Sequence, residues 1–376
     1  MAAVIFHPAY HRYAFGKEHP FNPVRVEMLL DLLRSSGHAP QLVEPEPATR
    51  EDILSVHEEY FVRRVEQLSA GREVPDSADY GLGTPDNPAF PGMDEAARWL
   101  VGGTLHGARL VAGGEKRVLQ LGGGLHHARR NFASGFCIYN DLAIAINYLT
   151  RRGLWVLYLD IDVHHGDGVQ QILYEDRRVM TLSLHESGTY LFPGTGEVHE
   201  IGYGLGRGLK MNLPLEPFTA GESYLELFES VLPAALRQFK PAVLVVQAGA
   251  DAHFDDPLAD LLLTTRDFEI LFRRILELAD SFTAGRVLFT LGGGYSLRSA
   301  PRVWAILYLL MHNLPLFQEL PAAWRERWGT FLDQELPQTL HDPVQENLEV
   351  PGSQAIAQRN RHVAQRLLET VRPYWF

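Results

Sequence analysis

The residues best suited to chemistry lie in the segment YLDIDVHHGDG, at positions 158–168. Because side chains alternate along a strand, an extended run through this segment would place Asp160, Asp162 and His164 on one face. Buried carboxylates are costly without a partner, and a bound cation is the usual way to keep several of them together. The segment therefore predicts a metal site, and the alternative is a polar cluster held by hydrogen bonds or salt bridges.

A third carboxylate follows another apolar run, since AVLVVQAGAD at 242–251 ends in Asp251. Together with Asp162 and His164 it would give two carboxylates and one imidazole, with positions left open for water and substrate, as in a catalytic metal site. Such a set could hold zinc or ferrous iron. Taken alone, Asp251 could equally be the N-cap of a helix.

Two glycine runs deliver further reactive groups. The segment LGGGLHHARRNFASGF at 121–136 carries the adjacent His126 and His127, and LGGGYSL at 291–297 carries Tyr295. Paired histidines beside a metal can act as general base and acid, and a phenol can donate a hydrogen bond to an oxyanion. The alternatives are structural histidines and a core tyrosine. A dinucleotide-binding loop is disfavoured, because histidine stands where the third glycine of that fingerprint should fall.

These segments all end short apolar runs that alternate with helix-like stretches. Continuous Val/Leu runs of this kind predict strands of a parallel sheet buried on both faces, near residues 4–8, 117–124, 154–162, 179–186, 242–251 and 286–295. Apolar residues spaced three and four apart predict helices over 22–37, 222–239 and 266–282. In an open parallel sheet, ligands bind beyond the carboxyl ends of the strands, which is where the unusual residues lie.

The composition limits the classes of protein to consider. With 376 residues, 46% hydrophobic and 21% charged, the chain is expected to be globular, and no linker-like stretch divides it. The net charge of −12 argues against nucleic acid as a direct partner and is compatible with a cationic substrate. Cys137 is the only cysteine, which excludes a disulfide framework and fits a cytoplasmic location. No apolar run is long enough to predict a membrane span.

Taken together, five segments resemble the zinc-dependent histone deacetylase superfamily: LGGGLHHARRNFASGFCIYND, YLDIDVHHGDGVQ, SLHESGTYLFPGTGE, QAGAD and LGGGYSL. HPFNPVRVEML at 19–29 and GTPDNPAFPGM at 83–93 resemble its bacterial acetoin-utilisation subgroup, which is close to class I. The resemblance covers about residues 4–310. It implies the arginase-like fold, a three-layer α/β/α architecture with a central, mostly parallel sheet. We expect one catalytic domain over 1–376, with a helical extension from about 311 to 376.

The resemblance also implies roles for the reactive residues. A catalytic divalent metal would be held by Asp162, His164 and Asp251. The acid–base set would comprise His127 as general base and acid, His126 tuning its charge, Asp167 and Asp160 orienting the two imidazoles, and Tyr295 polarising the acetyl carbonyl. Family members also carry a structural potassium ion, which would fall on Asp160, Asp162, His164, Ser183 and Leu184.

Substrate-binding residues are implied in the same way. Phe136 and Phe192 would grip the methylenes of the lysine, with Gly135 and Gly293 lining the same tunnel. Asp86 would hold the substrate backbone at the rim. Arg25 would lie at the inner cavity through which acetate leaves.

The activity implied is a zinc-dependent deacetylation of N-ε-acetyl-lysine in proteins to lysine and acetate, with an acyl-CoA synthetase as one candidate partner. An acetylated polyamine or another small acyl amide is the alternative substrate. An arginase-type ureohydrolase would need more carboxylates for a second metal, yet the residue two beyond Asp251 is His253. A silent module that binds acyl-lysine is disfavoured by the complete catalytic set.

Overall fold

A parallel β-sheet forms the centre of the molecule in the computed structural model, which describes residues 2–343 and 350–375. Within these residues, eight strands run in the order β2-β1-β3-β8-β7-β4-β5-β6, and every pair of neighbours is parallel. The strands are β1 (Ala3–Ile5), β2 (Leu42–Val43), β3 (Arg117–Gln120), β4 (Val156–Asp160), β5 (Val179–Glu186), β6 (Lys210–Leu215), β7 (Val243–Gln247) and β8 (Val287–Thr290).

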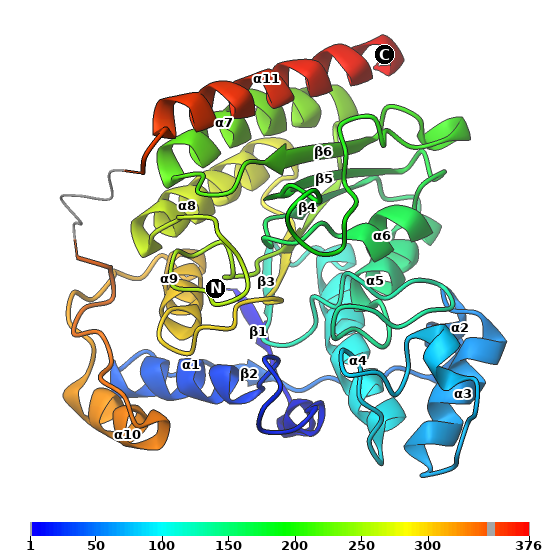
Figure 1. The fold of residues 1–376 in the computed structure, drawn as a ribbon, viewed down its shortest axis with the longest axis vertical. Helices are drawn as coiled ribbons and strands as arrows, with labels where there is room; N and C mark the ends of the chain where they lie inside the picture. The colour runs from blue at the N-terminus through cyan, green and yellow to red at the C-terminus, as the bar shows by residue number, and fades with distance from the viewer. Residues whose placement is uncertain (1, 344–349, 376) are drawn as a thin grey trace.

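Helices cover both faces of this sheet, which confirms the predicted three-layer α/β/α fold (Figure 1). The helices are α1 (Val24–Ser35), α2 (Arg50–Leu54), α3 (Glu59–Ser69), α4 (Met93–Ala112), α5 (Asp141–Arg151), α6 (Asp167–Ile172), α7 (Gly221–Phe239), α8 (Thr265–Phe282), α9 (Ala300–Met311), α10 (Ala322–Leu332) and α11 (Ser353–Val371). Short 3-10 helices are η1 (Pro8–Arg12), η2 (Ser77–Tyr80), η3 (Gly204–Gly206) and η4 (Arg372–Tyr374). Helices α4 and α5 lie on one face, and α7, α8 and α9 lie on the other.

Each of the six predicted apolar runs overlaps a strand, and the three predicted helices correspond to α1, α7 and α8. Two strands were not predicted, and both lie at sheet edges: β2 has only two residues, and β6 interrupts its apolar positions with Lys210, Asn212 and Pro214. An edge strand has one neighbour rather than two, so its sequence is less uniformly apolar.

The expected strand through YLDIDVHHGDG is shorter than predicted. β4 ends at Asp160, so Asp162 and His164 lie in the bend that follows and not on one strand face. The bend is stabilised by hydrogen bonds, because Oδ1 of Asp251 accepts from the backbone N–H of Val163 at 2.8 Å, and Oδ1 of Asp162 accepts from that of His164 at 3.0 Å. The two side chains therefore approach each other through loop geometry.

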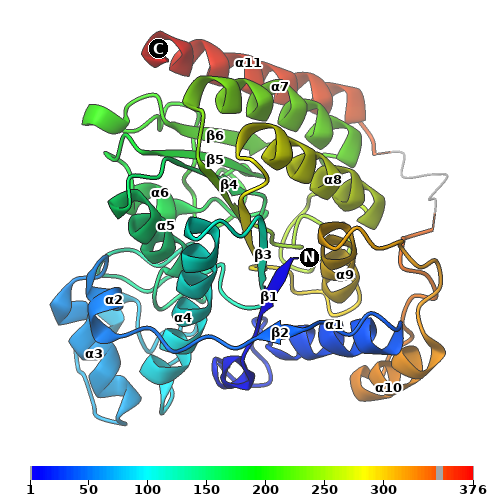
Figure 2. The same ribbon diagram turned by 180° about the vertical axis from the view of Figure 1, so that it is seen from behind.

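The C-terminal part of the chain contains α10 and α11. Helix α11 packs along α7 and the edge strand β6 (Figures 1 and 2). None of the helices in the described ranges combines the length and apolar character needed to cross a bilayer.

Candidate active site

Three ligand-type side chains meet beyond the carboxyl ends of β4 and β7. Asp162, His164 and Asp251 each offer one atom within 4.8 Å of the others, and all three residues are buried. The Nδ1 atom of His164 lies 3.0 Å from Oδ1 of Asp162 and 3.3 Å from Oδ2 of Asp251. Among the residues that the structure describes, this is the group of His, Cys, Asp and Glu side chains that could hold a metal ion.

The surroundings of this group fit a cation. Oδ2 of Asp251 is buried without a hydrogen-bond partner in the described part of the chain. Burial, followed by the nearby charge of Asp162, raises the pKa of Asp251 to about 7. Two carboxylates held this close in a buried site repel each other, and a divalent cation between them removes that cost. The donor set of two carboxylates and one imidazole suits zinc or ferrous iron.

Asp251 is not a helix N-cap, so that alternative is wrong. It lies in a turn, and the next helix, α8, begins at Thr265 with Thr264 as its capping residue. The Asp251 carboxylate instead stabilises the bend after β4 through Val163.

Gly293 allows the second glycine run to approach these carboxylates. Its backbone N–H donates to Oδ2 of Asp162 at 2.9 Å. A Cβ atom at this position would lie 2.0 Å from Oδ2 of Asp251 and 2.4 Å from Oδ2 of Asp162. Any side chain here would therefore displace the proposed metal ligands.

The two adjacent histidines each have their own carboxylate. The His126 and His127 rings lie 3.9 Å apart, centroid to centroid. Nδ1 of His126 is 2.8 Å from Oδ2 of Asp160, and Nδ1 of His127 is 2.7 Å from Oδ1 of Asp167. Since an ionised carboxylate only accepts hydrogen bonds, each Nδ1 carries the proton, and Nε2 of a neutral ring is then the free acceptor.

The electrostatic environments of these two rings differ. Burial opposes the charged form of both rings, but Asp160 and Asp162 outweigh it at His126 and raise its pKa to about 9. At His127, burial and then the charge of His126 lower the pKa to about 3. The pair therefore consists of one protonated and one neutral imidazole, and the neutral His127 is the one able to accept a proton.

Asp141, which was not predicted as a site residue, holds the loop that presents the histidines. Its Oδ2 accepts from the N–H of Gly124 at 3.0 Å, and its Oδ1 accepts from the N–H of Leu125 at 2.7 Å. Gly123 and Gly124 have φ of 73° and 76°, a conformation that glycine adopts most readily. The sequence feature that could have indicated Asp141 is the segment FCIYND, in which this carboxylate begins a buried helix.

Further positioning residues were also missed. Tyr158 donates its hydroxyl to Oδ2 of Asp160 at 2.6 Å, and Gln247 donates to Oδ2 of Asp162 at 2.6 Å. Arg129 binds Oδ2 of Asp167 at 2.9 Å. Tyr158 and Gln247 could have been predicted as positioning residues, because each is a polar side chain within a buried apolar run. No sequence feature distinguishes Arg129 from the other arginines.

Tyr295 lies beside the same group. Its ring contacts those of Phe136 and His164, with centroids 5.7 Å and 6.4 Å away. Its backbone N–H donates to Oδ2 of Asp256 at 2.7 Å, which fixes the segment after the glycine run. Burial, then the charge of Asp251, raises the pKa of its hydroxyl well above the ordinary value, so the phenol keeps its proton.

Two of the predicted tunnel residues, Phe192 and Gly135, lie against His127. Phe192 is 44% exposed and packs edge-on against His127, with ring centroids 4.9 Å apart. Gly135 is required by space, because a Cβ atom there would lie 2.2 Å from Cδ2 of His127. The half-buried Asp86 accepts a hydrogen bond from the N–H of Gly135 at 2.8 Å, which joins the loop of Asp86 to the segment before Phe136.

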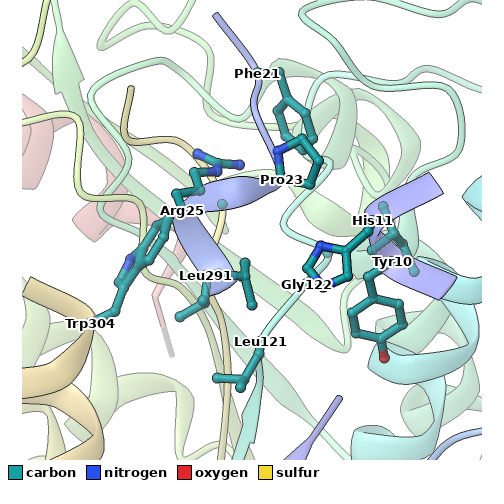
Figure 3. A pocket seen from close by; sticks show the side chains of 13 residues that line it. Tyr10, His11, Phe21, Pro23, Arg25, Leu121, Gly122, Leu291 and Trp304 are labelled. Carbon is teal, nitrogen blue, oxygen red and sulfur yellow. The ribbon is translucent and has the colours of Figure 1, made fainter. Parts of the chain in front are cut away.

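Arg25 lies on α1 beside a small internal cavity of about 30 Å³, enough for roughly two waters. Its guanidinium donates to the carbonyl of Gly294 at 2.8 Å and lies 5.8 Å from the ring centre of Tyr295. Figure 3 shows Arg25 and Trp304 on one side of the cavity, with His11 and Tyr10 on the other. Arg25 therefore connects this cavity to the glycine run that carries Tyr295.

Ser183 and Leu184, the remaining predicted cation ligands, lie on β5. Ser183 is the strand partner of Asp160, and its hydroxyl is 2.8 Å from Nδ1 of His185. Both residues are buried.

Comparisons with known proteins identify the family of this chain. Residues 19–311 match the histone deacetylase domain. The chain is 40% identical over 374 residues to the acetoin utilization protein AcuC of Bacillus subtilis (strain 168), covering 98% of this chain and 97% of that protein. It is 37% identical over 362 residues to AcuC of Staphylococcus aureus (strain MSSA476), covering 94% and 92%.

Solved structures give the same result. The crystal structure of a histone deacetylase homologue from Aquifex aeolicus superposes with a TM-score of 0.86 at 28% identity, covering 96% of this chain and 99% of that one. The homologue in complex with SAHA matches equally well, with a TM-score of 0.86. On the domain match, the identities and the shared fold, the chain belongs to the histone deacetylase family.

Proposed function

We propose that the chain hydrolyses the acetyl amide of N-ε-acetyl-lysine in proteins to lysine and acetate. The observation that carries this proposal is the convergence of the Asp162, His164 and Asp251 group with the His127–Asp167 pair at one edge of the sheet. Family membership supports a hydrolase of the deacetylase type.

Asp162, His164 and Asp251 would hold one divalent cation, zinc or ferrous iron. When bound, such a cation polarises the acetyl carbonyl and lowers the pKa of the attacking water. A site with three protein ligands would keep coordination positions for substrate and water, as catalytic sites require.

His127 is the proton carrier in this proposal. Its Nδ1 proton is engaged by Asp167, so Nε2 takes a proton from the attacking water and later gives it to the leaving amine nitrogen. Asp160 orients His126 in the same way, and the charge of His126 keeps its neighbour neutral before attack.

Tyr295 stabilises the oxyanion that forms from the acetyl carbonyl. Its hydroxyl, which remains protonated, donates a hydrogen bond to the developing negative charge. The ring contacts with Phe136 and His164 keep the phenol beside the proposed metal group.

Phe136 and Phe192 would enclose the lysine methylenes, since Phe192 packs against His127 and Phe136 packs against Tyr295. Gly135 and Gly293 would line the same tunnel, because the lack of a side chain lets the first lie against His127 and the second against the carboxylates of Asp162 and Asp251. Asp86 would accept hydrogen bonds from the substrate backbone at the rim.

Two accessory sites complete the proposal. Arg25, beside the internal cavity, would attract acetate and guide it away from the reaction site. A structural potassium ion would bind Asp160, Asp162, His164, Ser183 and Leu184, where β4 and β5 run side by side.

The substrate protein is proposed to be metabolic. The relatives from Bacillus and Staphylococcus are named acetoin utilization proteins, and we extend that association to this chain. An acetylated acyl-CoA synthetase in the cytoplasm is the partner we propose.

The test is acetate release from an acetyl-lysine peptide by chelated enzyme, with and without restored zinc or ferrous iron. We expect release that depends on the added metal, a stoichiometry of one metal per chain, and no release from Asp251→Asn. Acetylputrescine serves as the competing substrate, and its exclusive hydrolysis would replace the protein substrate with a polyamine.

Urea formed from arginine, with two metals per chain, would instead indicate an arginase-type enzyme. The structure gives a reason to expect otherwise. His253, which stands where a ureohydrolase would need another carboxylate, points its Nε2 at Oδ2 of Asp342, 2.9 Å away.

A further inference from the structure

A second pocket lies at the opposite end of the strands from the candidate active site. It has a volume of about 640 Å³, in the range of sites that bind small organic ligands. Trp155 directly precedes β4, Met180 lies at the start of β5, and Leu209 directly precedes β6. The pocket is therefore formed at the amino ends of β4, β5 and β6, whereas the proposed metal group lies beyond the carboxyl ends of β4 and β7.

The end of the chain forms one wall of this pocket, through Pro373, Tyr374 and Trp375. Figures 1 and 2 show the C-terminal end of α11 over the β5–β6 side of the sheet. The indole N–H of Trp375 donates to the carbonyl of Gly208 at 3.1 Å. Gly208 has φ of 83°, and a Cβ atom there would lie 2.3 Å from Cβ of Tyr374. These close contacts fix the wall against the loop before β6.

Most of the lining is apolar and aromatic. Trp155 packs on Phe239 with ring centroids 5.2 Å apart, yet 41% of Trp155 remains exposed. Leu205, on the loop before β6, is 73% exposed. Large exposed apolar side chains around a concave surface are typical of a binding site.

Two arginines, Arg177 and Arg207, give the pocket its charge. Among the residues that the structure describes, neither arginine forms an ion pair, and none of those lining the pocket carries a carboxylate. The guanidinium of Arg207 lies 4.9 Å from the ring centre of Tyr374. In a chain of net charge −12, two guanidinium groups beside an aromatic pocket that has no carboxylate among its described lining residues favour an anionic ligand.

We propose that this pocket binds an amphipathic organic anion. Its apolar body lies against Trp155, Phe239 and the C-terminal aromatic residues, and its carboxylate or phosphate group is bound by Arg177 and Arg207. An acyl carboxylate and a nucleotide phosphate share this chemistry, and the experiment below distinguishes them.

The test is a fluorescence titration of the full chain with anilinonaphthalene sulfonate, an aromatic anion. We expect saturable binding that the double variant Arg177→Gln/Arg207→Gln weakens by roughly tenfold or more. Arg72→Gln is the matched control, because Arg72 is exposed and lies just beyond α3, outside the pocket. Thermal melting of each variant verifies that it is folded.

A second pair of variants tests charge separately from shape. Leu205→Asp adds a negative charge at an exposed wall position and should weaken dye binding, whereas Leu205→Asn should retain most of it. Equal binding by wild type, Leu205→Asp and the double arginine variant would overturn the proposal.

Competition identifies the ligand class. Displacement of the dye by decanoate would indicate an acyl carboxylate, and displacement by adenosine monophosphate a nucleotide phosphate. Decanol lacks the charge and inorganic phosphate lacks the apolar body, so neither should compete. Displacement by decanol as effective as that by decanoate would overturn the anion assignment. All variants should retain wild-type acetate release, which keeps this test independent of the proposed deacetylase activity.

Discussion

The side-chain amide of Gln247 holds the carboxylate of Asp162 from the end of the neighbouring strand. Its Nε2 donates to Oδ2 of Asp162 at 2.6 Å, and its Oε1 accepts from the N–H of Gly249 at 2.7 Å. The second contact fixes which end of the amide faces the carboxylate. The orientation of one proposed metal ligand is therefore determined by β7 before any cation binds.

Replacing Gln247 by leucine should weaken metal binding without removing a ligand. Loss of a hydrogen bond to a ligating carboxylate commonly costs about tenfold to a hundredfold in metal affinity. Equilibrium dialysis against buffered zinc would measure the dissociation constant, with Gln365→Leu on the exposed face of α11 as control. An unchanged dissociation constant for Gln247→Leu would show that Asp162 needs no such support.

Tyr295→Phe should reduce turnover strongly while acetyl-peptide binding persists. Removing one oxyanion donor typically costs about a hundredfold to a thousandfold in kcat. Steady-state kinetics and fluorescence anisotropy of a labelled peptide would separate the two effects. Tyr308→Phe on α9 removes a hydroxyl outside the site and should behave as wild type. Near-normal turnover of Tyr295→Phe would contradict the assigned role.

Arg129 positions Asp167 from the solvent side. Its Nη2 and Nε lie 2.9 Å and 3.3 Å from Oδ2 of Asp167, whose other oxygen binds His127. Burial raises the pKa of Asp167, but the hydrogen bonds from His127 and Arg129 outweigh it and lower the pKa to about 2. The arginine thus helps to keep Asp167 ionised and aimed at His127.

We therefore expect Arg129→Gln to lower kcat by about tenfold and leave KM nearly unchanged, with partial recovery in Arg129→Lys. The effect is moderate because the Arg129 side chain is 37% exposed and water screens its charge. Steady-state kinetics would measure it against Arg72→Gln. A rise in KM at constant kcat would place Arg129 in substrate binding instead.

The sequence was sufficient to locate Asp162, His164 and Asp251, because each follows a buried apolar run and parallel strands bring such ends together. It was not sufficient to predict how they meet. The bend that turns Asp162 and His164 toward Asp251 depends on a hydrogen bond between Val163 and Asp251, residues 88 positions apart. The alternation of side chains along a strand relates only residues that are close in sequence. The prediction based on it therefore continued β4 past Asp160.

Strand β6 was missed for a related reason. Lys210 is fully buried, which no local pattern predicts for a lysine, and its ammonium group donates to the carbonyls of Asp176 and Val179 at 3.3 Å and 2.5 Å. These two carbonyls, about thirty residues away in the sequence, offset the cost of burying the lysine. The pocket beneath Trp155 and Trp375 was invisible for the same reason, since its walls are joined only by the folded chain.

His57 should make the protein lose stability in mild acid. Its Nε2 accepts from the N–H of Asn140 at 2.9 Å, and its Nδ1 lies 3.2 Å from the carbonyl of Arg130. Because Nε2 is an acceptor here, the ring is neutral and Nδ1 carries the proton. Burial lowers the pKa of His57 to about 4, from an ordinary 6.5.

The unfolded chain therefore binds a proton at His57 more readily than the folded chain does. The free energy of unfolding should fall as the pH drops from about 6.5 to about 4, by roughly 3 kcal/mol from this one group. Above this window the contribution is constant. His57→Gln keeps an acceptor for Asn140 but does not titrate, so urea unfolding across this pH range should show a shallower slope for it than for wild type. His362→Gln, at an exposed position on α11, should keep the wild-type slope. A stability difference between His57→Gln and wild type that is the same at every pH would mean that protonation of this imidazole does not drive the acid response.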